Sequence, residues 1–182
     1  MRELRVARSE LILGGDAAAK TARAQALADA WLAQGEGRRV VYIATAQAWD
    51  AEMRGLVDAH RRGQDRPGMV TVEEPTELAH ALGSGSRPDT LIVVDCLTLW
   101  LTHWLMPMQG EAHDAPVDAL CAALPNLPGP VVLVSNEIGL GVIPMGREVR
   151  GFVDALGSLN QRAAQFFQCA VFNLAHAFFR NP

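Results

Sequence analysis

The sequence predicts an α/β fold in which a mostly parallel sheet is covered by helices on both faces. Three apolar runs lack the polar alternation of a half-exposed strand, which is typical of strands buried on both faces. Stretches with helical composition separate these runs, as the right-handed crossovers between parallel strands require. The three runs are Val40–Ile43, Leu91–Val94 and Val131–Val134.

The first predicted strand leads into a segment that is close to a phosphate-binding loop. The usual pattern for such a loop is G-x-x-x-x-G-K-[ST]. Gly14, Lys20 and Thr21 have the spacing of this pattern, and Gly15 adds a second glycine at its start. Ala19, however, stands where the pattern has its second glycine.

Two interpretations of this loop remain open. A phosphate site needs backbone N–H groups that wrap an anion at the start of a helix, with a lysine charge and a hydroxyl near Mg²⁺. Against it, Ala19 adds a Cβ, and Asp16 puts a negative charge where a triphosphate would lie. In the alternative, Asp16 is the N-cap of an ordinary helix that begins with strong helix formers, Ala17–Ala19.

The other elements follow from the same signals. The predicted strands are Glu10–Leu13, Val40–Ala44, Met69–Val72, Thr90–Asp95, Val131–Ser135 and Ala170–Leu174. The predicted helices are Ala18–Ala33, Asp50–Arg62, Thr76–Leu82, Leu97–Leu105, Pro116–Leu124 and Arg147–Phe167. Glycine, proline and polar residues predict loops at Gly63–Gly68, Gly83–Asp89 and Pro107–Ala115. Ligands in such folds bind at the carboxyl ends of the strands, so those ends are where we expect a site.

Bulk properties narrow the class of protein. A chain of 182 residues with 49% hydrophobic and 20% charged residues suits one globular domain, residues 1–182. A net charge of −4 without a basic block argues against a nucleic-acid partner. Cys96, Cys121 and Cys169 lack metal-ligand spacing and are expected to be buried thiols in a reducing compartment. We see no apolar signal-peptide core and no run of about 18 apolar residues, so a soluble cytoplasmic protein without a membrane span is expected.

Polar residues follow several of the predicted strands. Asp95 ends the fourth strand, where an acid holds Mg²⁺ in phosphate-binding-loop proteins, although it could instead cap the next helix. Glu73 ends the third strand, either close to a ribose or metal or simply as a polar strand end. The sequence does not decide between these two interpretations of Glu73. Thr45-Ala46-Gln47 stands at the end of the second predicted strand, and this stretch does not indicate a function on its own.

Three further features are candidates for chemistry. His60 is followed by Arg61 and Arg62; its neutral imidazole could attack a phosphoryl group whose charge the arginines would neutralise, but a solvated histidine is the commoner case. The stretch Ser135–Pro144 combines a polar strand end with two glycines and a proline, which is typical of a binding loop. Polar residues on the last helix could face the site or solvent: Arg147, Glu148, Arg150, Asp154, Asn160, Gln161 and Arg162.

Together these motifs resemble the bifunctional adenosylcobinamide kinase/adenosylcobinamide-phosphate guanylyltransferase family of cobalamin biosynthesis, from about Glu10 to about Ala164. No single motif is decisive, but the ordered set is specific. The set comprises Gly14-Gly15 with Lys20-Thr21, Tyr42–Gln47, Asp50–Met53, His60, Thr71–Pro75, Asp95–Leu101, Val134–Gly141 and Leu159–Arg162.

The resemblance implies a RecA-like P-loop fold, a homotrimer and two reactions. ATP or GTP phosphorylates adenosylcobinamide, and GTP then guanylylates His60, which passes GMP to the corrinoid phosphate to give adenosylcobinamide-GDP. It also implies that Thr21 and Asp95 hold Mg²⁺. The residues implied to contact the nucleotides are Gly14, Gly15, Lys20, Thr21, Thr45, Ala46, Gln47, Arg61, Arg62, Glu73 and Asp95.

The sequence departs from the family pattern mainly at the phosphate loop. The family reads Gly-Gly-x-Arg-Ser-Gly-Lys-Ser, whereas residues 14–21 here lack the arginine, the serine and the second glycine. A Trp-Arg pair expected before Thr71 is Met69-Val70, and the C-terminal strand runs into residues 173–179 without the usual glycine. A relative that kept the fold but lost efficient triphosphate binding is therefore the alternative hypothesis. A small-molecule kinase of another pathway would leave His60 unexplained.

Overall fold

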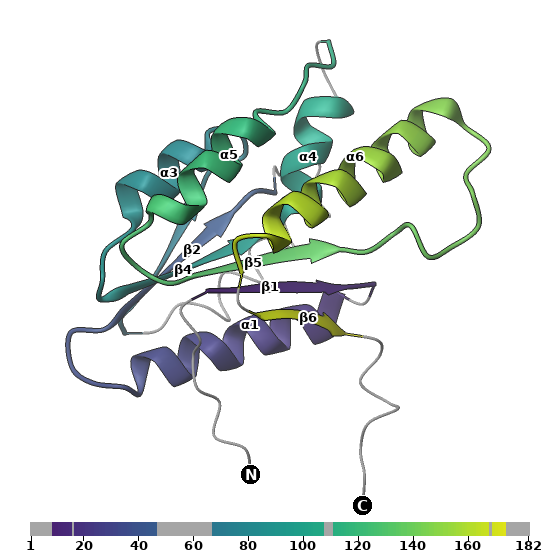
Figure 1. The fold of residues 1–182 in the computed structure, drawn as a ribbon. Helices are drawn as coiled ribbons and strands as arrows, with labels where there is room; N and C mark the ends of the chain where they lie inside the picture. The colour runs from purple at the N-terminus through teal and green to yellow at the C-terminus, as the bar shows by residue number, and fades with distance from the viewer. Residues whose placement is uncertain (1–8, 16, 47–66, 108–110, 168, 174–182) are drawn as a thin grey trace, which may run out of the picture.

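The computed structural model describes residues 9–15, 17–46, 67–107, 111–167 and 169–173 (Figure 1). Its strands are β1 (Ser9–Gly14), β2 (Arg39–Ala44), β3 (Met69–Glu73), β4 (Thr90–Asp95), β5 (Val131–Asn136) and β6 (Cys169–Asn173). Its helices are α1 (Ala17–Leu32), α3 (Leu78–Gly85), α4 (Leu97–Leu105), α5 (Val117–Ala123) and α6 (Arg147–Ala164), with a 3₁₀ turn at Leu124–Asn126. The strands form one sheet in the order β3-β2-β4-β5-β1-β6, and every neighbouring pair is parallel. The predicted α/β fold is confirmed.

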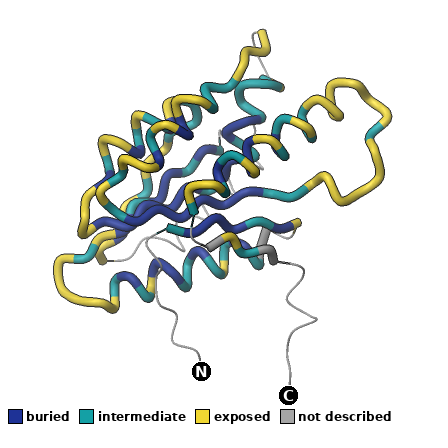
Figure 2. Tube along the Cα trace, viewed as in Figure 1, coloured by how far each residue is buried: buried dark blue, intermediate teal, exposed yellow. Residues whose placement is uncertain are grey.

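Helices cover the sheet on both faces, as Figure 1 shows, with α1 on one side and α3, α4, α5 and α6 on the other. Each face has its own apolar core, and the strands β1, β2, β4 and β5 between the two cores are largely buried (Figure 2). Leu91, Ile92, Val93 and Val94 of β4 alternate between the two cores and are all 0% exposed. Burial on both faces explains why this strand has no polar alternation.

Helix α1 packs on the sheet through a stripe at helical spacing. Ala24, Leu27, Ala28 and Trp31 are all buried, which is the i, i+3, i+4, i+7 pattern of an amphipathic helix. The Trp31 indole N–H donates to the Arg39 carbonyl at 3.0 Å, which joins the end of the helix to the start of β2.

An ion pair reinforces the contact between α1 and β1. The Arg23 guanidinium donates through Nε and Nη2 to both carboxylate oxygens of Glu10. Glu10 is buried in the interior of the domain, so the bidentate partner offsets the cost of burying its charge.

Helix α3 differs from its predicted bounds at both ends. It begins at Leu78 rather than Thr76, because the Glu74 carboxylate takes the N–H groups of Thr76 and Glu77 and holds this segment as a turn. It continues to Gly85, so the predicted loop Gly83–Asp89 begins only at Ser86.

Helix α6 ends at Ala164, three residues before the predicted end at Phe167. The N–H groups of Gln165, Phe166 and Phe167 bond to carbonyls three residues earlier, so the last turn tightens out of the α-helix. The predicted strand Ala170–Leu174 is observed as Cys169–Asn173, and Leu174 lies outside the described residues. The predicted helix Asp50–Arg62 and most of the predicted loop Gly63–Gly68 also lie outside them.

Candidate functional site

The carboxyl ends of five strands meet at one edge of the sheet, and their last residues lie on the same side. In four of these strands the residue two positions before the last one belongs to the core that packs against α1. In β3 the residue four positions before the last one belongs to that core. Because side chains alternate along a strand, the end residues also lie on the α1 side. The backbone register pairs Ala44 with both Glu73 and Asp95, and Gly14 with Asn136. Three of the predicted site residues, Gly14, Glu73 and Asp95, therefore share one side of this edge.

Lys20 is the fourth residue of α1, at the end of its first turn, and points back to the end of β1. Its Nζ donates to the Gly14 carbonyl at 2.9 Å, and the residue is 2% exposed. Thr21, the next residue, is half-buried, and Gly15 is exposed with open space where a Cβ would be. Asp16 lies outside the described residues. The structure therefore places the Lys20 ammonium next to the carbonyl of Gly14, the first residue of the loop.

The Gly14 carbonyl also ties β1 to the loop after β5. It accepts the Glu137 N–H at 3.3 Å as well as the Lys20 ammonium. One carbonyl thus connects the two segments that the sequence suggested as binding loops.

Thr45 locks the end of β2 to the end of β4. Its hydroxyl donates to the Cys96 carbonyl at 2.7 Å and accepts the Cys96 N–H at 2.9 Å, and its own N–H donates to the Asp95 carbonyl at 3.2 Å. The residue is 1% exposed. The Thr45 hydroxyl is therefore committed to the backbone, and the half-buried Ala46 is the next residue that faces outward.

The thiol of Cys96 is kept protonated at neutral pH. Burial, and next the negative charge of Asp95, raise its pKa to about 11, while the Lys20 charge opposes this weakly. A thiolate nucleophile is therefore excluded at this position.

Two acids at the end of β3 behave differently. Glu73 is exposed at the strand end, as expected for a residue that could reach a ligand. Glu74 turns back instead, and its Oε1 accepts the Thr76 N–H at 2.9 Å, the Thr76 hydroxyl at 3.2 Å and the Glu77 N–H at 2.7 Å. Partial burial pushes the pKa of Glu74 upward, but these hydrogen bonds outweigh it and leave the pKa below its usual value.

Two residues bond to the backbone at the end of β5, and neither contact was expected from the sequence. Thr98 of α4 accepts the Asn136 N–H through Oγ1 at 3.0 Å, and Asn160 of α6 donates Nδ2 to the Asn136 carbonyl at 3.0 Å. Asn160 interrupts an otherwise apolar buried stripe on α6, and that interruption was the available signal. Thr98 was part of the stretch Asp95–Leu101 that resembles the family, but no role was expected for it.

Several expected site residues cannot be located here. Gln47, His60, Arg61 and Arg62 lie outside the described residues. Among the described residues, no three or more His, Cys, Asp or Glu side chains gather as metal ligands. Thr21 and Asp95 would supply only two oxygens, which is enough for Mg²⁺ when phosphates and water complete the shell. No helix in the described part of the chain has the length and apolar composition to cross a bilayer.

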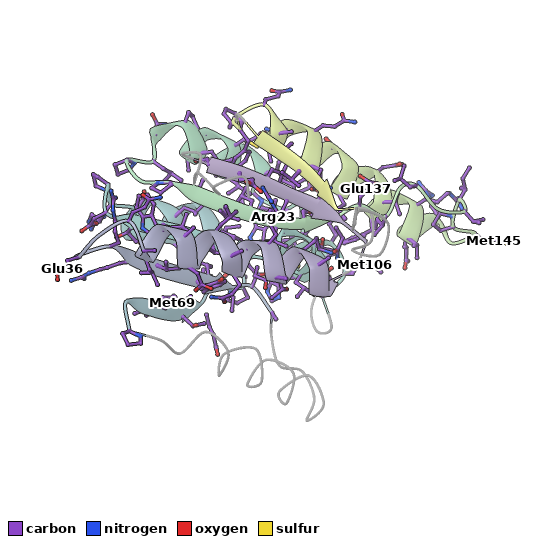
Figure 3. The ribbon with its side chains drawn as sticks, turned by 90° about the horizontal axis from the view of Figure 1, so that it is seen from below. Arg23, Glu36, Met69, Met106, Glu137 and Met145 are labelled. Carbon is purple, nitrogen blue, oxygen red and sulfur yellow. The ribbon has the colours of Figure 1, made fainter. Side chains whose placement is uncertain are left out.

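The loop between β5 and α6 projects from this edge and is unusually apolar. Figure 3 shows Glu137 close to the sheet and Met145 far out along the projecting segment. Leu140, Val142, Ile143 and Met145 are 74%, 96%, 77% and 97% exposed. Such side chains gathered in one exposed loop are typical of an interaction surface.

Comparison with known proteins agrees with this architecture. Residues 10–176 match the family described as "Cobinamide kinase / cobinamide phosphate guanyltransferase". The chain is 42% identical to the bifunctional adenosylcobalamin biosynthesis protein CobP of Pseudomonas aeruginosa over 167 residues, which cover 91% of this chain and 92% of that protein. It is 32% identical to the bifunctional adenosylcobalamin biosynthesis protein CobU of Escherichia coli and 34% identical to the CobU of Salmonella typhimurium. Each of these two matches covers 85% of this chain and 88% of the relative. The chain therefore belongs to the cobinamide kinase/cobinamide phosphate guanyltransferase family.

Proposed function

We propose that this protein phosphorylates adenosylcobinamide with ATP or GTP and then transfers GMP from GTP to the product, giving adenosylcobinamide-GDP. The observation that carries the proposal is the single sheet edge where Gly14, Asp95 and Asn136 gather on the side of the buried Lys20. An edge of this kind is the usual ligand site of an open α/β sheet. The family match makes cobinamide the substrate of choice.

The triphosphate is expected to lie over the Gly14–Thr21 loop. Lys20 would turn its ammonium from the Gly14 carbonyl, at the start of this loop, toward a phosphate oxygen. Thr21 and Asp95 carry the hard oxygen atoms that Mg²⁺ prefers, so these two residues would hold it. When bound, the ion would neutralise charge on the phosphates.

The guanosine nucleotide is expected along the ends of β2 and β3. Because the Thr45 hydroxyl is bonded to Cys96, Thr45 would contribute through its backbone. Glu73 is exposed at the end of β3, whereas the carboxylate of Glu74 bonds within the turn that follows. The full expected set comprises Thr45, Ala46, Gln47, Arg61, Arg62 and Glu73.

His60 is the proposed carrier of GMP. A neutral ring nitrogen would attack the α-phosphorus of GTP and release pyrophosphate. A phosphate oxygen of the corrinoid would then attack the same phosphorus, and the histidine would leave. This division turns one difficult transfer into two displacements.

We further propose that the protein works as a homotrimer of single-domain chains in the cytoplasm. The exposed apolar side chains of the loop after β5 support assembly, because a large apolar surface of this kind is costly in water. The free thiols of Cys96 and Cys121 suit a reducing compartment.

Covalent labelling tests the proposed carrier. The protein is incubated with Mg²⁺ and α-labelled GTP, and we expect a protein-bound label that acid removes and base does not. His60→Ala should carry no label, whereas His80→Ala, which removes an exposed histidine on α3, should label like the parent. Equal labelling of the His60→Ala variant would refute the role of His60.

A catalytically inactive relative is the second candidate, and the engaged Lys20 favours it. An ammonium held at 2.9 Å from the Gly14 carbonyl, with Ala19 in the loop, would bind a triphosphate only after rearrangement. Thermal unfolding separates the two candidates, because a ligand at 100 times its dissociation constant adds about 2.7 kcal/mol of stability. No increase in melting temperature with ATP or GTP, and no label on His60, would support the inactive relative.

A further inference from the structure

The last residue of β5 occupies a central position in the candidate site. β5 is the strand between β1, which leads to Lys20, and β4, which ends in Asp95. Asn136 pairs with Gly14, whereas Asp95 pairs with Val134. Asn136 therefore extends two residues, or about 6–7 Å, beyond the acid on the neighbouring strand.

The side chain of Asn136 lies on the α1 side of the sheet. Val132 and Val134 pack in the core that contains Ala24 and Leu27 of α1. Strand alternation continues this direction to Asn136, whereas Ser135 points toward α4 and α6. The carboxamide is thus on the side where the first turns of α1 and the phosphate loop lie.

The backbone of Asn136 is fixed on both sides. Thr98 accepts its N–H and Asn160 donates to its carbonyl, each at 3.0 Å. The next N–H, of Glu137, donates to the Gly14 carbonyl that also accepts Lys20. The half-buried carboxamide itself makes no hydrogen bond to any other residue that the structure describes. A fixed backbone that carries an uncommitted amide is suited to meeting a ligand.

We propose that the Asn136 carboxamide binds the terminal phosphate of the nucleoside triphosphate and stabilises it during transfer, with Thr98 and Asn160 as positioning residues. This inference rests on the proposed kinase function. In that step the cobinamide hydroxyl oxygen bonds to the γ-phosphorus, the bond from that phosphorus to the β–γ bridging oxygen breaks, and the nucleoside diphosphate leaves with the electron pair. The hydroxyl proton passes to water. The amide N–H of Asn136 donates to an oxygen of the transferring group. This donor is already in place before the reaction, so its use costs no reorganisation.

The chemistry of Asn160 agrees with this assignment. It is 4% exposed among the apolar residues of α6, and its Oδ1 has no hydrogen-bond partner among the residues that the structure describes. A buried polar group without a partner is costly. Its Nδ2 bond to the Asn136 carbonyl gives a physical reason for an asparagine in this apolar stripe.

Steady-state kinetics of cobinamide phosphorylation test the inference. Asn136→Ala should lower kcat about 100-fold, the usual loss for one transition-state donor, and raise the KM for the nucleotide about tenfold, because the contact with the bound terminal phosphate is lost as well. Asn136→Ser, which restores a donor, should recover part of this loss. Asn126→Ala is the matched control, because Asn126 is an exposed asparagine whose amide bonds to the nearby Ala122 carbonyl.

A double-mutant cycle tests the positioning role of Asn160. Asn160→Ala should lower kcat about tenfold, and the double variant with Asn136→Ala should be no slower than Asn136→Ala alone. Additive losses in kcat would show that Asn160 acts independently of Asn136 and would reject its positioning role. An Asn136→Ala variant as fast as the parent would overturn the proposal.

A binding measurement separates this inference from the proposed function. With a non-hydrolysable triphosphate and the matching diphosphate, the parent should prefer the triphosphate and Asn136→Ala should lose about tenfold of that preference. Equal preferences in the two proteins would overturn the inference even if the parent phosphorylates cobinamide. A lost preference in a protein that does not phosphorylate cobinamide would keep the inference and reject the substrate.

Discussion

Thr45 shows how one side chain can serve the site without facing it. Its hydroxyl makes two hydrogen bonds with the backbone of Cys96, 51 positions away in sequence, and so joins the ends of β2 and β4. Asp95, which precedes Cys96, owes its position to this junction. The family resemblance suggested a nucleotide contact for Thr45, whereas the structure assigns its hydroxyl a supporting role.

Removing that hydroxyl should destabilise the protein. We expect Thr45→Val to lower the free energy of unfolding by about 2–3 kcal/mol, because it leaves a buried N–H and a buried carbonyl without a partner. Thr45→Ser keeps the hydroxyl and should lose less than about 1 kcal/mol. Urea denaturation followed by circular dichroism measures both values. A larger loss in Thr45→Ser than in Thr45→Val would show that the methyl group, not the hydroxyl, matters here.

The position of several candidate residues could be predicted at this scale, because strand ends can be recognised from apolar runs. Gly14, Glu73 and Asp95 were expected at strand ends and lie there on one side of the sheet. The supporting partners could not be predicted in the same way. Thr98 and Asn160 bond to the backbone of Asn136 from separate helices, and only the tertiary structure brings these residues together.

At the scale of elements, the start of α3 depends on a carboxylate outside the helix. Glu74 accepts three hydrogen bonds from Thr76 and Glu77, and the Trp100 indole donates to the Thr76 carbonyl at 2.9 Å. Local propensity placed the helix start at Thr76, but the turn around Glu74 delays it to Leu78. Competition between a side-chain acceptor and the helix backbone is the reason for this error in the predicted boundary.

The lowered pKa of Glu74 makes this turn sensitive to acid. A carboxyl whose pKa is depressed on folding contributes stability above its unfolded pKa, near 4.5, and loses it as the pH falls through the lower folded value. Glu74→Gln should therefore unfold more easily than the parent at pH 7, by less than about 1 kcal/mol because the group is partly exposed. The difference should shrink toward zero as the pH falls well below 4.5.

Urea denaturation of the parent and the variant at several pH values measures this difference. Glu77→Gln is the matched control, because Glu77 is exposed and joins the turn through its N–H rather than its carboxylate. A gap between Glu74→Gln and the parent that stays constant with pH would contradict the assigned role of the charge.

At the scale of the whole molecule, the strands of the sheet could be predicted from the sequence more completely than the exposure of the surface. Apolar runs without polar alternation predicted β2, β4 and β5, because a strand that is buried on both faces has apolar residues at successive positions. The loop after β5 was expected to bind a ligand from its glycines and its position. Its degree of exposure, with Val142 and Met145 almost fully accessible, became visible only in three dimensions.

This exposure leads to a prediction about assembly. If Val142 and Met145 pack against a second copy of the chain in the proposed trimer, carboxylates at both positions should break it, because burying an unpaired charge is costly. The parent should sediment with three times the mass of the 19.6 kDa chain, and the double variant Val142→Glu, Met145→Glu should sediment as a monomer. Ala122→Glu, which adds a carboxylate at an exposed position on α5, should leave the mass unchanged. A double variant that keeps the parent's mass would mean that this loop lies outside the subunit interface, and its apolar side chains would then need another occupant.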